Sequence, residues 1–156
     1  MPLEQLPYLD EQAVVVAAPP EAVWTAVLRT LAAGFGAPPA RQAARLLGCD
    51  PPSTSGWDRP GVGSTVPGFR VVTAQPPELL VVAGCHRFSR YGIVVRIEPA
   101  TGGTRVRAES RAAFPGPHGA LYRLGVVSSG GHVLAVRRLL RQVRRTAESA
   151  APAGTP

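Results

Sequence analysis

The spacing of apolar residues changes from every second to every third or fourth position near residue 115, and this change constrains the fold more than any other feature. In residues 103–114, small and apolar side chains alternate with charged ones, as in a strand with one buried face. The face predicted to be buried comprises Thr104, Val106, Ala108, Ser110, Ala112 and Phe114, and the other face comprises Arg105, Arg107, Glu109 and Arg111. Such a strand needs an apolar layer to cover it.

The residues after Pro117 can provide that layer. On a helical wheel of about 100° per residue, one side carries apolar or small residues and the other carries arginines. The first side comprises Leu121, Gly125, Ser128, His132, Ala135, Val136, Leu139 and Val143, and the second comprises Arg123, Arg137, Arg138, Arg141, Arg144 and Arg145. Because the phase continues through residues 128–131 (SSGG), the pattern predicts one long helix, bent at the glycines.

The N-terminal half predicts a strand, two helices and a loop. An apolar, β-branched run at 12–18 predicts a strand, and the prolines that follow favour a helix start. This helix should end near 34–36, and a shorter one should span 39–47 and end at Gly48. Residues 50–63 have the Pro, Gly and Ser content of a loop.

Strands of period two fill the middle of the chain and indicate a meander. They are expected at 68–75, 78–88 and 89–98, before the strand at 103–114. The links between them are short, with one turn near Phe88 and Ser89, which is typical of antiparallel pairing. Gly84 and Gly92 are places where a sheet can bend. The fold class predicted is α+β, a curved antiparallel sheet wrapped around a long C-terminal helix.

Length and composition point to one cytoplasmic domain. We expect 11–147 to form the domain, 1–10 a flexible lead-in and 148–156 a disordered tail. No apolar run is long enough for a membrane span, and no signal peptide is recognisable, so neither integral membrane association nor export is expected. The net charge is +7, and arginine is used throughout in place of lysine, which is typical of proteins from GC-rich genomes. Aromatic residues that could stack on bases are few, so nucleic acid is not an expected partner.

The predicted sheet–helix interface has less side-chain volume than a filled core needs. Small or polar residues stand there, which favours a cavity, although bulky side chains from elsewhere could fill it. If His86 pairs with Tyr91 across the turn, both face inward, as does His132 on the helix. The candidate ligand-binding residues are His86, Tyr91, Ile93, Val95, Ala108, Ser110, Ala112, Ser128 and His132.

Several segments resemble one superfamily. Residues 14–24 (VVVAAPPEAVW) and 69–82 (FRVVTAQPPELLVV) are similar to the first strand, helix start and meander of the START-related lipid-transfer and polyketide cyclase superfamily, SRPBCC. With 84–91 (GCHRFSRY) and 128–132 (SSGGH), the chain looks like a bacterial branch of it. The resemblance covers about 11–147 and implies a helix-grip fold with a deep apolar cavity. It carries over no catalytic motif.

Two functions for the cavity and one for the surface follow. The first is binding of a small hydrophobic, lipid- or polyketide-like ligand; the alternative is a polyketide cyclase or dehydratase that uses the cavity histidines. The third is binding of an unidentified protein partner through the arginine face of the last helix. No metal and no cofactor are expected, because the histidines lack ligand spacing and no carboxylate is predicted on the inner face. Cys49 and Cys85 are expected to be free thiols.

Overall fold

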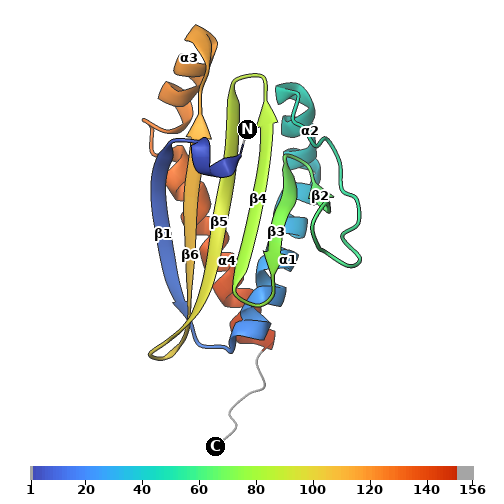
Figure 1. Ribbon diagram of the computed structural model, residues 1–156, viewed down its shortest axis with the longest axis vertical. Helices are drawn as coiled ribbons and strands as arrows, with labels where there is room; N and C mark the ends of the chain where they lie inside the picture. Colours follow the sequence, from blue (N-terminus) through green and yellow to red (C-terminus); the bar gives the residue numbers. More distant parts are fainter. Residues whose placement is uncertain (1, 151–156) are drawn as a thin grey trace, which may run out of the picture.

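A six-stranded antiparallel sheet lies across two long helices in the computed structural model, which describes residues 2–150 (Figure 1). The strand order is β1-β6-β5-β4-β3-β2. After a short 3-10 turn at Leu3–Gln5, the elements are β1 (Tyr8–Val16), α1 (Pro20–Gly36), α2 (Pro38–Leu47), β2 (Thr65–Val66), β3 (Phe69–Gln75), β4 (Leu79–His86), β5 (Ser89–Ala100), β6 (Gly103–Ala113), α3 (Gly116–Val126) and α4 (Gly131–Ala150). This architecture confirms the predicted α+β class and the curved sheet around a C-terminal helix.

The core lies where α1 and α4 meet the inner face of the sheet. The inner face predicted for β6 is confirmed, since Thr104, Val106, Ala108 and Ser110 are all buried. Glu109 departs from the predicted alternation, because it is buried on the other face, where it pairs with Arg96 and Arg111. Helix α1 contributes the expected apolar stripe, and α4 contributes Val136, Leu140, Val143 and Ala147. Burial of these side chains, at roughly 25 cal/mol per Å² of apolar surface, holds the helices on the sheet.

The single long helix predicted after Pro117 is wrong, because the chain breaks into α3 and α4 at residues 127–130. Gly130 has φ +78°, a left-handed conformation that ends helical geometry and suits glycine. The break changes the phase: Leu121 is 66% exposed and Gly125 and Ser128 are exposed, contrary to prediction. Helix α3 instead turns Gly119, Tyr122 and Val126 inward. The apolar face predicted for residues 121–143 is therefore correct only for the residues that lie in α4.

The N-terminal segment is more structured than its sequence suggests. Strand β1 begins at Tyr8, within the predicted lead-in, and contains a register shift between Tyr8 and Asp10. Leu6 is buried, and its carbonyl accepts a hydrogen bond from Arg111 Nη1 at 3.1 Å. At the other end, α4 continues to Ala150, so residues 148–150 of the predicted tail are helical. Residues 151–156 lie outside the described residues.

Candidate functional site

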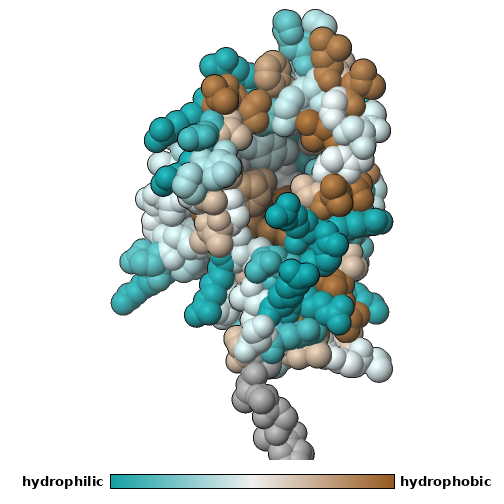
Figure 2. Space-filling view, turned by 180° about the vertical axis from the view of Figure 1, so that it is seen from behind, coloured by the Kyte–Doolittle hydropathy of each residue, from teal (hydrophilic) through white to brown (hydrophobic). Residues whose placement is uncertain are grey.

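A pocket of about 710 Å³ lies between the sheet and the helices, and we call it the sheet–helix pocket. Figure 2 shows this face of the molecule hollowed between apolar side chains. Its walls come from α1, α2, the inner face of β5 and β6, α3 and the start of α4. Ser110, Ala112 and His132, which are among the small or polar residues predicted at this interface, lie along this pocket.

Six of the nine predicted site residues line this pocket. They are His86, Tyr91, Ile93, Ser110, Ala112 and His132. Val95 and Ala108 do not line it, because they lie further along their strands, where α1 and α4 cover the sheet and make a filled core. Ser128 does not line it either, because the helix break leaves it exposed in the loop.

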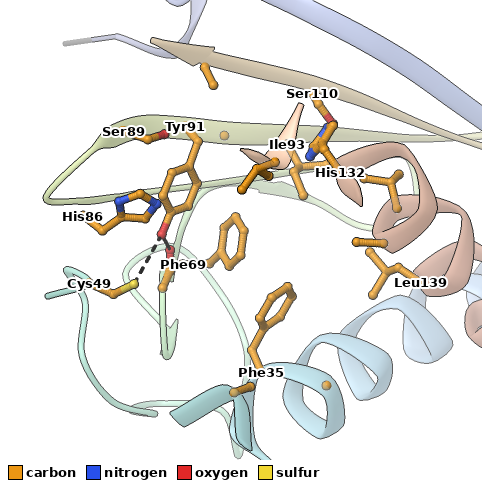
Figure 3. Close-up of a pocket in the computed structure, with 18 of the residues that line it drawn as sticks. Phe35, Cys49, Phe69, His86, Ser89, Tyr91, Ile93, Ser110, His132 and Leu139 are labelled. Atoms are coloured by element: carbon orange, nitrogen blue, oxygen red, sulfur yellow. Dashed lines mark hydrogen bonds between the residues drawn. The ribbon is translucent and has the colours of Figure 1, made fainter. Parts of the chain in front are cut away.

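Apolar side chains form the middle of the pocket. Phe69 packs with its ring centroid 4.7 Å from that of Phe35 and 5.2 Å from that of Tyr91. Ile93 and Leu139 lie on the opposite side of the same space (Figure 3). Sequence reasoning did not assign Phe35 and Phe69 to the site, although both are large apolar residues at the ends of predicted elements.

One polar end of the pocket gathers Tyr91, Cys49 and His86 (Figure 3). The Tyr91 hydroxyl donates to the carbonyl of Gly68 at 2.8 Å and lies 3.9 Å from Cys49 Sγ. Burial raises the pKa of Tyr91 well above its ordinary value, and burial also raises the pKa of the Cys49 thiol. Tyr91 therefore acts here as a neutral donor that ties β5 to the start of β3, and the thiol is not activated as a nucleophile.

His86 lies beside Tyr91, but the predicted pairing is wrong. His86 pairs with Ser89 and Tyr91 with Gly84, because the turn lies at Arg87 and Phe88, one residue earlier than predicted. The two rings still meet, with centroids 5.5 Å apart, and His86 lies 4.7 Å from Tyr122. His86 Nδ1 accepts a hydrogen bond from the Phe88 N–H at 3.1 Å, which requires that nitrogen to be unprotonated.

Burial lowers the pKa of His86 below its ordinary value of 6.5. As the pH falls below about 6.5, the unfolded chain therefore takes up a proton at this residue more readily than the folded protein, and stability falls. Urea unfolding of wild type and His86→Gln between pH 7.5 and about pH 5 is expected to show a smaller loss for the variant. Equal losses would contradict a partly buried, neutral His86.

The second polar end contains His132 from α4 and Ser110 from β6, side by side in Figure 3. His132 Nε2 lies 3.5 Å from Asp10 Oδ2, and the two side chains are only 20% and 21% exposed. Asp10 is opposite Ser110 in the β1–β6 register. The expectation that no carboxylate shares the inner face is therefore wrong. It failed because residues 1–10 were read as a lead-in, whereas β1 extends over Asp10.

Metal binding and membrane crossing find no support in the part of the chain that the structure describes. Within residues 2–150, no three His, Cys, Asp or Glu side chains come together in a way that could hold a metal ion. Among the same residues, no helix combines the length and apolar character needed to cross a membrane. The arginines of α4 are exposed, with Arg144 paired to Glu148 at 3.1 Å and Arg137 to Gln12 at 3.0 Å, and Arg138 also lines the sheet–helix pocket.

The sheet, the C-terminal helix and the pocket between them define a helix-grip fold, and comparison with solved structures agrees. Protein CV1439 from Chromobacterium violaceum is 19% identical and has a TM-score of 0.53, over 91% of this chain and 99% of that one. The Aha1 dimer from Colwellia psychrerythraea is 15% identical with a TM-score of 0.53, over 88% of this chain and 94% of that one.

The same fold occurs in the di-domain ARO/CYC StfQ of the steffimycin biosynthetic pathway. It is 15% identical with a TM-score of 0.55, over 94% of this chain and 52% of that one, so this chain spans about half of StfQ. At such identities the likeness concerns the fold alone. No protein-family model matches the sequence, and the search of curated proteins gives no match.

Proposed function

We propose that this protein belongs to the SRPBCC superfamily and binds a small, mostly apolar molecule in the sheet–helix pocket. The observation that carries the proposal is the pocket itself, whose volume of about 710 Å³ lies within the roughly 300–1,000 Å³ of small-ligand sites. Its aromatic and aliphatic middle offers an apolar surface, and its two polar ends can orient a ligand. The helix-grip neighbours support the same use of the fold.

Catalysis of the cyclase or dehydratase type is the second candidate. The observation that favours it is the approach of Asp10 to His132, since a carboxylate can orient an imidazole for proton transfer. The support from His86 and Tyr91 is weaker than the sequence suggested. The Tyr91 hydroxyl and His86 Nδ1 already bond to the backbone. Turnover of a polyketide-like substrate that survives both His86→Ala and His132→Ala would remove these histidines as the acid–base machinery, and absence of turnover in wild type would count against the candidate.

Filling the pocket tests the binding proposal directly. Gly34 lines the pocket on α1, and a Cβ added there meets no atom within 4 Å, so Gly34→Phe places a ring in open space. We expect wild type to bind N-phenyl-1-naphthylamine saturably, with enhanced probe fluorescence, and Gly34→Phe to bind it at least about tenfold more weakly. Circular dichroism should show that the variant remains folded.

The matched control is Gly125→Phe. Gly125 is also a helix glycine with no atom within 4 Å of an added Cβ, but it does not line the pocket. This variant should bind the probe as wild type does. The proposal fails if wild type shows no saturable binding, or if the Gly34 and Gly125 variants bind the probe equally well.

A further inference from the structure

The polar end formed by Ser110 and His132 contains hydrogen-bonding atoms that no protein group satisfies. Ser110 is 1% exposed and lines the pocket, yet its Oγ has no hydrogen-bond partner among the described residues. Thr30 Oγ1, which lines the pocket from α1, is in the same condition within residues 2–150. Leaving a buried polar group unpaired is destabilising, so such groups usually have a partner in the functional state.

His132 belongs to this cluster and lies close to Asp10. Its Nε2 lies 3.5 Å from Asp10 Oδ2, a separation that brings the two groups together without a well-formed hydrogen bond. Asp10 does not line the pocket, so the carboxylate lies behind the imidazole as seen by a ligand. Asp10 is thus placed to act through His132 and is a positioning residue.

The carboxylate determines which nitrogen of an uncharged imidazole carries the proton. An uncharged imidazole has one N–H and one bare nitrogen, and a neighbouring carboxylate favours the N–H on the side that faces it. With the proton on Nε2 toward Asp10, Nδ1 is left as an acceptor. The hydroxyl of Ser110 beside it can donate as well as accept. The pair therefore offers one obligatory acceptor and one donor.

We propose that this cluster binds a neutral hydroxyl group, an alcohol, enol or phenol, at one end of an otherwise apolar ligand. This inference rests on the proposed function of the pocket. A hydroxyl can donate to His132 Nδ1 and accept from Ser110 Oγ, whereas an ether or ketone can only accept. A charged group would meet both signs near this cluster, the Asp10 carboxylate behind the ring and the guanidinium groups of Arg111 and Arg138, which line the same pocket, so neither charge is favoured over a neutral hydroxyl.

Two probes that differ in one hydrogen-bond donor test this assignment: 2-naphthol and 2-methoxynaphthalene. Wild type is expected to bind 2-naphthol about tenfold more tightly, the ratio for one well-placed hydrogen bond. In Asp10→Asn the ratio should fall toward one, with the affinity for 2-methoxynaphthalene almost unchanged, because the nitrogen that accepts from the hydroxyl is no longer fixed. Ser110→Ala removes a donor that both probes can use, so it should weaken the binding of both. The control Glu11→Gln removes the next carboxylate of β1, which faces Arg107 at 3.5 Å, and should keep the wild-type ratio.

A spectroscopic readout separates positioning from a merely structural effect. Two-bond ¹H–¹⁵N spectra, with the His132 signal identified by its loss in His132→Gln, should show the Nε2–H tautomer in wild type and a changed tautomer in Asp10→Asn. Equal affinities of wild type for the two probes, or a ratio that survives Asp10→Asn, would overturn the hydroxyl assignment alone. Failure of wild type to bind either probe would instead overturn the proposed function and the assignment with it.

Discussion

Replacing Gly84 by alanine is expected to lower the free energy of unfolding by about 3 kcal/mol, which is the upper end of the range for adding a group where the packing leaves no space. A Cβ on Gly84 would lie 2.0 Å from the Gly68 carbonyl oxygen and 3.2 Å from that of Asp50. Both are backbone atoms, and Gly68 is held twice, by its N–H to Pro51 O at 2.8 Å and by Tyr91 at its carbonyl. Neither side can move without breaking a hydrogen bond.

The matched control for this prediction is Gly34→Ala. A Cβ at Gly34 meets nothing within 4 Å, and Gly34 lies inside α1, where alanine is favoured over glycine by about 1 kcal/mol. Urea unfolding should therefore place the two variants on opposite sides of wild type. A stability of Gly84→Ala within about 0.5 kcal/mol of wild type would show that β4 and the Gly68 turn are not in this close contact.

The elements that were predictable from the sequence are those whose burial follows a local period. In residues 103–114 and in α1, one face of the element packs against a single covering surface. The apolar period along the sequence therefore shows which residues belong to that face. Gly48, with φ +68°, ends α2 as its position predicts. Gly84 was singled out as a place where the sheet can bend, and the structure shows that it also lies in close contact with the backbone of Gly68.

The failures share a different cause, which is that tertiary contacts decided the outcome. The phase through residues 128–131 is compatible with one helix, but α3 takes its own inward face from Gly119, whose Cβ would lie 2.6 Å from the Phe114 backbone. Asp10 has no apolar period around it, so only pairing with β6 brings it into a strand. The His86 pairing depended on the position of one turn, and a shift of that turn by one residue moved the partner of His86 by two.

These limits explain which part of the candidate site could be foreseen. His132, Ser110 and His86 were found because polar residues interrupt an otherwise apolar face, a signal that is visible locally. Asp10, Thr30 and Cys49 were missed because each lies on an element whose approach to the pocket is set by the fold. The proposed chemistry of the second polar end depends on Asp10, so it could be inferred only once the strand and the helix had been placed together.

Substitution of Phe69 by alanine is expected to lower the free energy of unfolding by about 3 kcal/mol, which is at the low end of the range for deleting a buried aromatic ring. Phe69 is buried at the start of β3 and joins the filled core to the pocket, with ring centroids of Phe35 and Tyr91 at 4.7 and 5.2 Å. Its removal deletes both ring contacts and leaves space that the rigid sheet cannot close. Urea unfolding monitored by circular dichroism measures the effect.

Phe88→Ala provides the comparison, because Phe88 has the same side chain in a half-exposed turn. Its ring stacks on Tyr122 at 5.6 Å but is not part of the core, so a loss of about 1 kcal/mol is expected. Since both variants remove one phenyl group, the difference between them isolates the contribution of burial at Phe69. If the two variants unfold at the same urea concentration, the Phe69 ring does not pack against both the core and the pocket residues. Phe69 would then not hold the apolar middle of the pocket in place.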